Sequence, residues 1–267
     1  MSWLGKLVGG AFGFMLGGPL GAIFGASVGH QFDAGLDGIA GESINPGDPQ
    51  RVQMAFFTAT FAVMGHVAKA DGRVSNEEIG LAKRVMDNME LSPELREAAI
   101  RLFQQGKQVD FPLTDVLRQF RLECHRRTHL VRMFVEIQIQ AAFADGVYDA
   151  KEEILLLDIC AQLGLSRFEY QVIKGQVQAQ HRFQQSSEQF HTSKSGLSKL
   201  DDAYAVLGVT ATDDNAAVKK AYRRLMSQHH PDKLVAKGLP EEMMQMAKQK
   251  TQQIRKAYET VRETRGF

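Results

Sequence analysis

The chain has 267 residues, 24% of them charged, and a formal net charge of +1 at pH 7. The near-zero net charge excludes a protein that is basic throughout, as a general nucleic-acid binder would be, and the charged fraction excludes a many-pass membrane protein. The two cysteines, Cys124 and Cys160, exclude a disulfide-rich secreted framework and a multi-cysteine zinc module. Both lie in apolar helical patterns, so we expect two reduced thiols packed in a core.

An uncharged, glycine-rich segment runs from Leu7 to Gly29. At about 1.5 Å per residue, a helix of this length reaches about 35 Å and crosses a bilayer core of about 30 Å. Glycine recurs at every fourth position, which lines one helical face with no side chains and favours close approach of a second helix. These glycines are Gly9, Gly13, Gly17, Gly21, Gly25 and Gly29. We predict a single transmembrane helix within residues 1–32 that forms a homodimer and is kinked at Pro19.

Two other interpretations of this segment stay open. Lys6 followed by an apolar stretch, with small residues at 25–27, is also typical of a cleaved signal peptide, although the apolar run is longer than usual. The segment would alternatively pack inside a soluble core. The charge pattern, with Lys6 on the short side and Asp33, Asp37 and Glu42 on the long side, favours placing the bulk of the protein outside the cell membrane.

A linker and a helical domain follow. Residues 33–49 end in "GESINPGDP", whose Gly, Pro and Asn are typical of a linker. From residue 50 to 178 the apolar spacing is helical, and we predict an all-helical domain of about seven helices. Helix starts are marked by capping pairs and a Ser-Pro step. These are Ser75 with Glu78, Ser92-Pro93, Asp149 with Glu152, and Ser166 with Glu169.

The helical domain contains an internal repeat. "AKADGRVSNEE" at 68–78 and "AFADGVYDAKE" at 142–152 align without a gap, and each follows a long apolar helical pattern. The alignment pairs Asp71 with Asp145 and Glu78 with Glu152. We predict two related helical hairpins packed face to face.

The last part of the chain is a tether followed by a small basic module. Residues 179–199 are rich in Gln, Ser and His and lack sustained apolar periodicity, which predicts a flexible linker. Residues 200–267 predict three helices, and in the second one Val218, Tyr222 and Leu225 face inward. The same helix exposes a basic strip, which by itself is typical of a solvated face. The strip consists of Lys219, Lys220, Arg223 and Arg224.

The stretch "SQHHPDKL" at 227–234 ends this second helix. Adjacent histidines before a proline do not converge easily on one metal ion, and no nucleophile with a supporting base can be identified for a catalytic dyad. Pro231 lacks an amide hydrogen and bends the chain, which fixes His230 and Asp232 at a turn. The residues therefore favour a rigid turn over a metal site or a catalytic dyad.

This module resembles the J-domain of DnaJ-type co-chaperones. The matching residues are "AYAVLGV", "VKKAYRRL", His230-Pro231-Asp232 and "IRKAYETV", in the order and spacing of that family. The resemblance implies that Lys219, Arg223 and Arg224 dock on an acidic surface of a DnaK-type chaperone. It also implies that His230, Pro231 and Asp232 trigger ATP hydrolysis by that chaperone. The basic loop at 233–240 departs from the family pattern, and neither a Gly/Phe-rich segment nor a zinc-bearing domain follows.

The whole chain resembles the membrane-anchored DnaJ-like proteins of Gram-negative bacteria, whose central domain is similar to the TerB fold. The resemblance implies an all-α protein with one transmembrane helix, a TerB-like bundle at 50–178 and a J-domain at 200–267. It also implies a periplasmic N-terminus and a cytoplasmic bulk at the inner membrane, because a J-domain needs cytosolic DnaK and ATP. This consideration overrides the charge pattern around Lys6. The family is further associated with the stress response of the cell envelope.

The expected function is that of a co-chaperone, not an enzyme, that recruits DnaK to the membrane. The alternative is a cation-responsive signalling scaffold built on the central domain, because TerB-like folds have been linked to metal binding through acidic residues. Asp71, Glu78, Asp145 and Glu152 would supply oxygen ligands for a divalent cation. Capping of the following helices explains the same carboxylates, and we favour that explanation and expect no cofactor. A periplasmic hydrolase lacks a catalytic set in this sequence.

Overall fold

The computed structural model describes residues 18–28, 47–70, 80, 82–83, 85–87, 91–143, 149–188, 196–239 and 243–267. Every regular element among these residues is a helix, in agreement with the predicted all-α fold. Several residues singled out above lie outside the described ones. They are Gly9, Gly13, Gly17, Gly29, Asp71, Glu78 and Asp145.

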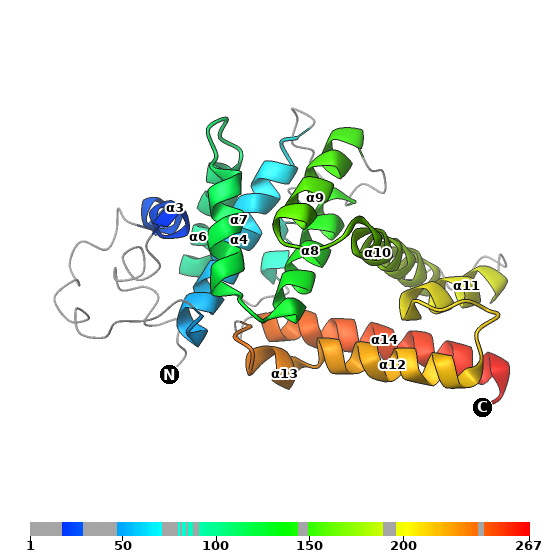
Figure 1. The fold of residues 1–267 in the computed structure, drawn as a ribbon. Helices are drawn as coiled ribbons and strands as arrows, with labels where there is room; N and C mark the ends of the chain where they lie inside the picture. The colour runs from blue at the N-terminus through cyan, green and yellow to red at the C-terminus, as the bar shows by residue number, and fades with distance from the viewer. Residues whose placement is uncertain are drawn as a thin grey trace.

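The helices form a bundle with a long helical pair beneath it (Figure 1). In chain order they are α3 (Gly18–Val28), α4 (Pro49–Val67), α6 (Pro93–Gly106), α7 (Leu113–Glu123), α8 (Thr128–Ala142), α9 (Ala150–Gln162), α10 (Arg167–Glu188), α11 (Gly196–Leu207), α12 (Asn215–His229), α13 (Pro231–Val235) and α14 (Met244–Arg265). We call the part from α4 to α10 the central bundle and the part from α11 to α14 the C-terminal module.

Helix α4 is the centre of the central bundle. Its residues are apolar almost all round, and such a helix is expected to be buried. Helices α6, α7, α8 and α9 pack against it. Aromatic rings join three of these helices, because the ring centroid of Phe120 on α7 lies 6.1 Å from that of Phe56 on α4 and 4.6 Å from that of Phe134 on α8. The core of the bundle is therefore built around α4.

Three of the predicted helix starts are confirmed. Ser92 and Asp149 each accept a hydrogen bond from a backbone N–H in the first turn of α6 and α9. At the start of α10 the backbone N–H of Glu169 donates to Ser166 Oγ at 3.2 Å, and the N–H of Ser166 donates to the Glu169 carboxylate at 2.8 Å. This is the reciprocal capping box expected from the sequence. The start predicted at Ser75 and the two loops of the internal repeat lie outside the described residues.

The two cysteines are buried and free, as expected of packed thiols. Burial raises the pKa of Cys124 and of Cys160 to about 12. Both thiols are therefore protonated and unreactive at neutral pH.

Helix α3 lies on the bundle, where it contacts α4, α6 and α7. Leu20 is fully buried there, and its backbone N–H donates to Gln119 Oε1 of α7 at 2.8 Å. The described helix starts at Gly18, whose φ is +59°, and Pro19 stands in its first turn, where proline is tolerated. Among the described residues there is no helix that combines the length and the apolar character needed to cross a bilayer.

The transmembrane helix was predicted within residues 1–32, of which the structure describes only 18–28. Gly21, one of the predicted dimer-face glycines, is buried within the chain. Apolar side chains such as Leu20 pack as well in a helical groove as in lipid, so hydropathy alone does not distinguish the two environments. The predicted homodimer rests on the glycine spacing alone and stays a prediction.

The predicted flexible linker at 179–199 is helical where the structure describes it. Helix α10 continues to Glu188, and α11 starts at Gly196. Ala179 and Phe183 are buried in a hydrophobic cluster with residues of α11, α12 and α14. The linker prediction failed there because Gln and Ser between these apolar residues hid a helical face that only the neighbouring helices cover.

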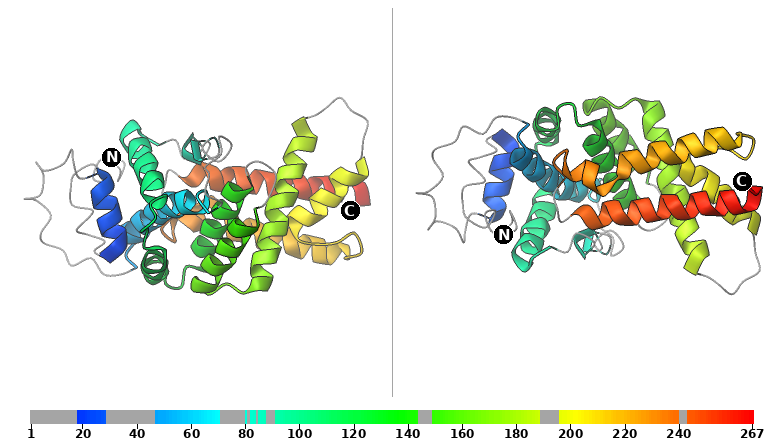
Figure 2. Two further views of the ribbon diagram at one scale, coloured as in Figure 1. Left: turned by 90° about the horizontal axis from the view of Figure 1, so that it is seen from above. Right: turned by 90° about the horizontal axis from the view of Figure 1, so that it is seen from below.

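In the C-terminal module α12 and α14 lie side by side, and α10 and α11 cross above them (Figure 2). Helix α11 ends before Gly208, whose φ of +67° suits glycine, and Asp214 caps α12 by accepting from Ala217 N at 2.6 Å. Val218 and Leu225 are buried as predicted, and Tyr222 stacks on Tyr258 of α14 at 4.2 Å. The short helix α13 was not predicted.

Candidate partner-binding surface

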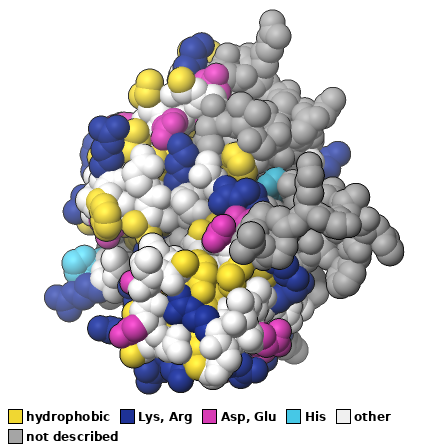
Figure 3. Space-filling model, turned by 90° about the vertical axis from the view of Figure 1, so that its right-hand side faces the viewer, with side chains coloured by type: hydrophobic (Ala, Val, Ile, Leu, Met, Phe, Trp, Pro, Cys, Tyr) yellow, Lys and Arg dark blue, Asp and Glu magenta, His cyan; other side chains and the backbone are white. Residues whose placement is uncertain are grey.

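The basic strip of α12 faces solvent. Its four side chains are all exposed, because Val218, Leu225 and the other apolar residues of α12 occupy the opposite face. The Lys219 ammonium lies 4.8 Å from the ring centroid of Phe267. Figure 3 views the end of the molecule that carries α11 and the start of α12, and shows Lys and Arg side chains along its lower edge. The strip is therefore available to an acidic partner.

Arg265, near the C-terminus, fixes the loop that leads into α12. Its guanidinium donates to Tyr204 Oη at 2.6 Å and to the backbone oxygens of Ala211 and Asp213 at 2.9 and 2.6 Å. It also lies over the Tyr204 ring at 4.7 Å. These contacts hold α11, α12 and α14 together at the end of the module that is far from the His-Pro-Asp turn.

The His-Pro-Asp turn connects α12 to α13. His230 has an extended backbone (φ −63°, ψ 124°), as expected before a proline, and Pro231 occupies the first position of α13. His230 and Asp232 are exposed, with 46% and 86% of their side chains accessible. His230 Nδ1 lies 3.9 Å from Asp232 Oδ2. Lys233 Nζ closes the turn by donating to Ser227 Oγ at 2.7 Å. The turn thus exposes the side chains of His230 and Asp232 on a constrained backbone.

The loop after this turn is not the basic loop predicted for 233–240. Residues up to Val235 continue as α13, and Leu234 and Leu239 are buried against the central bundle. Gly238, with a φ of +93°, fits closely against Val52 of α4. The sequence predicted only a basic loop here, and the leucines between and after the lysines decide its packing.

The two adjacent histidines lie in different environments. His230 is exposed, whereas His229 is 5% exposed and its Nε2 lies 3.8 Å from Glu136 Oε1 of α8. Burial lowers the pKa of His229 to about 4, so it is neutral at pH 7. No residue near His229 in the sequence indicates a role for it, because the carboxylate it lies against, that of Glu136, belongs to the central bundle.

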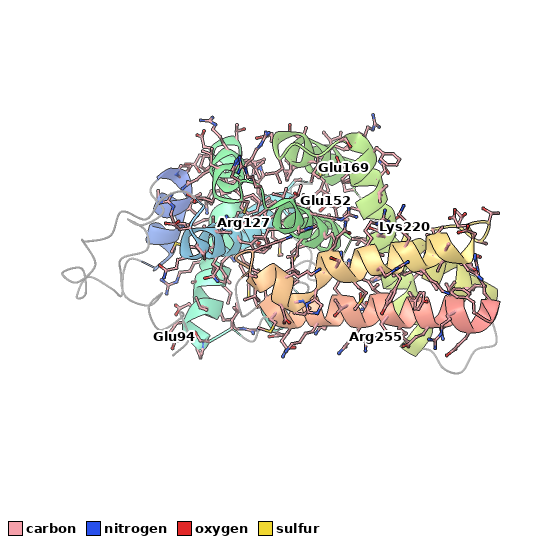
Figure 4. The ribbon with its side chains drawn as sticks, turned by 60° about the horizontal axis from the view of Figure 1, so that its bottom comes forward. Glu94, Arg127, Glu152, Glu169, Lys220 and Arg255 are labelled. Atoms are coloured by element: carbon pink, nitrogen blue, oxygen red, sulfur yellow. The ribbon has the colours of Figure 1, made fainter. Side chains whose placement is uncertain are left out.

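Of the four predicted cation ligands the structure describes only Glu152, which is buried in the first turn of α9 (Figure 4). The other three carboxylates lie outside the described residues. Within the described parts of the chain, no cluster of three or more metal-binding side chains occurs. The cation site therefore stays a prediction.

The sequence matches three family models in the same order as the structural parts. Residues 1–39 match the co-chaperone DjlA transmembrane domain, residues 57–175 match the tellurite resistance protein TerB, and residues 202–265 match the DnaJ domain. The co-chaperone protein DjlA of Coxiella burnetii is 45% identical over 100% of both chains. The chain belongs to the DjlA family. Its DnaJ-domain match includes the exposed basic strip and the His-Pro-Asp turn.

Other relatives agree with this assignment. The co-chaperone protein DjlA of Salmonella typhimurium is 45% identical over 100% of both chains, and that of Escherichia coli O157:H7 is 48% identical over 80% of this chain and 81% of its own. No solved structure matches the chain. Membership in the DjlA family means a membrane-anchored chain with a J-domain, and a J-domain implies a partner of the DnaK type.

Proposed function

We propose that this chain stimulates ATP hydrolysis by a cytosolic DnaK-type chaperone and recruits that chaperone to the inner membrane. The observation that supports the proposal is the exposed turn of His230, Pro231 and Asp232 at the end of the exposed basic strip. The strip would meet an acidic surface of the chaperone, and the turn would then engage it. ATP chemistry would take place on the chaperone.

The basic strip determines how fast, and in which orientation, this protein and the chaperone associate. Lys219, Arg223 and Arg224 are exposed on one face of α12 and point to the solvent, where charge complementarity mainly raises the association rate and fixes orientation. Because exposed charges are screened by salt, the concentration of this protein needed for half-maximal stimulation should rise with ionic strength. Arg223→Glu should raise that concentration further and weaken its dependence on salt.

The membrane orientation follows from the partner. A DnaK-type chaperone and ATP are cytosolic, so the J-domain has to face the cytosol and the N-terminus the periplasm. Tethering the J-domain to the bilayer would confine the activated chaperone to clients at that surface. Proteoliposomes that carry the protein should therefore retain the chaperone on sedimentation in the presence of ATP.

The test of the function is steady-state ATP hydrolysis by DnaK with and without the full chain in detergent micelles. Stimulation should be lost in His230→Gln because the turn no longer presents an imidazole to the chaperone, and the module should stay folded because 46% of that side chain is exposed. Lys151→Gln, an exposed change on α9, is the matched control and should stimulate like the unchanged chain. Equal stimulation by His230→Gln and the control would contradict the proposal.

A further inference from the structure

The C-terminal module, α11 to α14, is the J-domain. The end of this J-domain that carries the His-Pro-Asp turn packs on the central bundle. Leu234, Leu239, Met243 and Ala247 are buried in the same hydrophobic cluster as the residues of α4, α6, α7 and α8. The other end of the J-domain has its own cluster, which also takes in Phe183 of α10. The J-domain therefore shares its core with the central bundle at the end where it contacts its partner.

A buried carboxylate lies in the middle of this contact. Glu136 of α8 is 5% exposed. Lys250 Nζ of α14 lies 3.0 Å from Glu136 Oε2, and Arg132 Nε of α8 lies 3.4 Å from Glu136 Oε1. His229, the neighbour of the functional His230, lies against the same carboxylate at 3.8 Å. One side chain of the central bundle thus contacts both long helices of the J-domain.

Two glutamines of α10 complete the cluster. Lys250 Nζ donates to Gln180 Oε1 at 2.8 Å, and Arg132 Nη2 donates to Gln176 Oε1 at 2.8 Å. Both acceptors of the Lys250 ammonium therefore belong to the central bundle, and only 12% of its side chain is exposed. A buried charge is costly without such partners, and Lys250 would lose them if the J-domain shifted on the central bundle. The cluster therefore favours one relative position of the two domains over others.

The electrostatic environment keeps Glu136 ionised. Burial by itself raises the pKa of this carboxyl, but the charges of Lys250 and Arg132 outweigh burial and lower the pKa to about 2. The ion pair is therefore present at all physiological pH values, and its contribution to docking is constant there.

The His-Pro-Asp turn stays accessible to a partner when the J-domain is docked on the central bundle. His230 and Asp232 are exposed although His229 and Leu234, on either side of them, are buried against the central bundle. On α14, Arg255 lies on the side turned away from the central bundle (Figure 4). Docking thus fixes the backbone around the turn without covering its functional side chains.

We propose that Glu136 is a positioning residue, which docks the J-domain on the central bundle and holds the His-Pro-Asp turn in the orientation that the DnaK-type chaperone meets. The proposal rests on the proposed function and adds to it that the central domain takes part in stimulation. A conformational change of α8, caused by a ligand or client of the central domain, would then be transmitted to the turn.

The test compares Glu136→Gln with the unchanged full chain in micelles by hydrogen exchange and by stimulated ATP hydrolysis. Exchange in 231–239 should accelerate at least about tenfold, because the local hydrogen bonds of so short a helix protect its amides only while the helix is docked. Exchange in α4 should not change, which shows that the variant is folded. The concentration for half-maximal stimulation should rise several-fold. Lys250→Met removes the partner charge and should do the same, whereas Lys248→Met, an exposed change on α14, should do neither.

Each other outcome contradicts the proposal. Unchanged exchange in 231–239 would show that Glu136 does not hold the docked state. Faster exchange with unchanged stimulation would assign Glu136 a purely structural role, and faster exchange with increased stimulation would make docking inhibitory. An unchanged chain that does not stimulate DnaK would overturn the proposed function and the positioning role together, while the exchange data would still decide the docking.

Discussion

Gly65 of α4 allows a close contact with α6, and replacing it by alanine has two opposing effects on stability. A Cβ added at Gly65 would lie 2.0 Å from the backbone oxygen of Phe103 on α6, and one added at Gly106 would lie 1.8 Å from the backbone oxygen of Ala62. The contact is thus reciprocal. Intrinsic helix propensity favours alanine over glycine by about 1 kcal/mol, whereas the clash opposes it.

The clash should dominate in Gly65→Ala. Ordinary van der Waals contact begins at 3.4 Å, and no rotamer change can relieve the clash, because the position of a Cβ is fixed by its own backbone and the atom it meets is a backbone oxygen. The helices would have to separate by roughly 1.5 Å, which a close-packed interior does not absorb without loss of contacts. Overpacking typically costs about 1–3 kcal/mol, and a clash of a Cβ with a backbone oxygen should cost as much as the upper value of that range or more. We therefore expect a net loss of about 2 kcal/mol or more after the gain in propensity.

The assay is thermal unfolding of the full chain in micelles, followed by far-UV circular dichroism. A loss of about 2 kcal/mol should lower Tm by roughly 4–8 °C in a chain of this size. The matched control is Gly175→Ala in α10, where an added Cβ meets nothing within 4 Å, and it should be neutral or slightly stabilising. A Gly65→Ala chain as stable as the control would refute the packing argument.

Two further predictions follow from buried side chains. Phe183→Ala should destabilise the chain by about 3 kcal/mol in chemical unfolding, because Phe183 is only 2% exposed. The control Phe168→Ala, at a position that is 77% exposed, should change the free energy of unfolding by less than about 0.5 kcal/mol. Equal values for the two variants would contradict the packing of Phe183 and favour the flexible linker predicted from the sequence. His229 has its pKa lowered by burial from 6.5 to about 4, so the unfolded chain binds the proton first and stability should fall as pH drops from 6.5 to 4. His229→Gln should flatten that part of the stability curve, and an unchanged slope would show that other groups cause it.

Local features of this protein were predictable because they depend on neighbours in the sequence. Ser166 and Glu169 are three residues apart, and their capping box needs only the backbone between them. Pro231 restricts its own φ and the backbone of His230, so the turn and its exposed side chains follow from the order of residues. The basic strip follows from the helical period of the apolar residues that alternate with it.

The sequence was least informative where amphipathic helices meet partners far along the chain. The polar residues after 178 suggested a tether, yet Phe183 packs among α11, α12 and α14. The apolar segment around Leu20 predicted a membrane span, and its described part, α3, contacts α4, α6 and α7. In both cases the sequence shows that a face is apolar or polar, but only the assembled helices determine what covers it.

The sequence by itself determined the helices, their caps and the His-Pro-Asp turn, because hydrogen bonds and dihedral restrictions within a few residues fix them. Tertiary structure alone decided how the J-domain sits on the central bundle. Lys250 and its acceptor Gln180 are 70 positions apart, and nothing in the sequence near either one indicates the other. Such a pair depends on the shared core of Leu234, Leu239 and α4, which places the two domains against each other, because a buried hydrogen bond from a charged group gains its energy from geometry and not from composition.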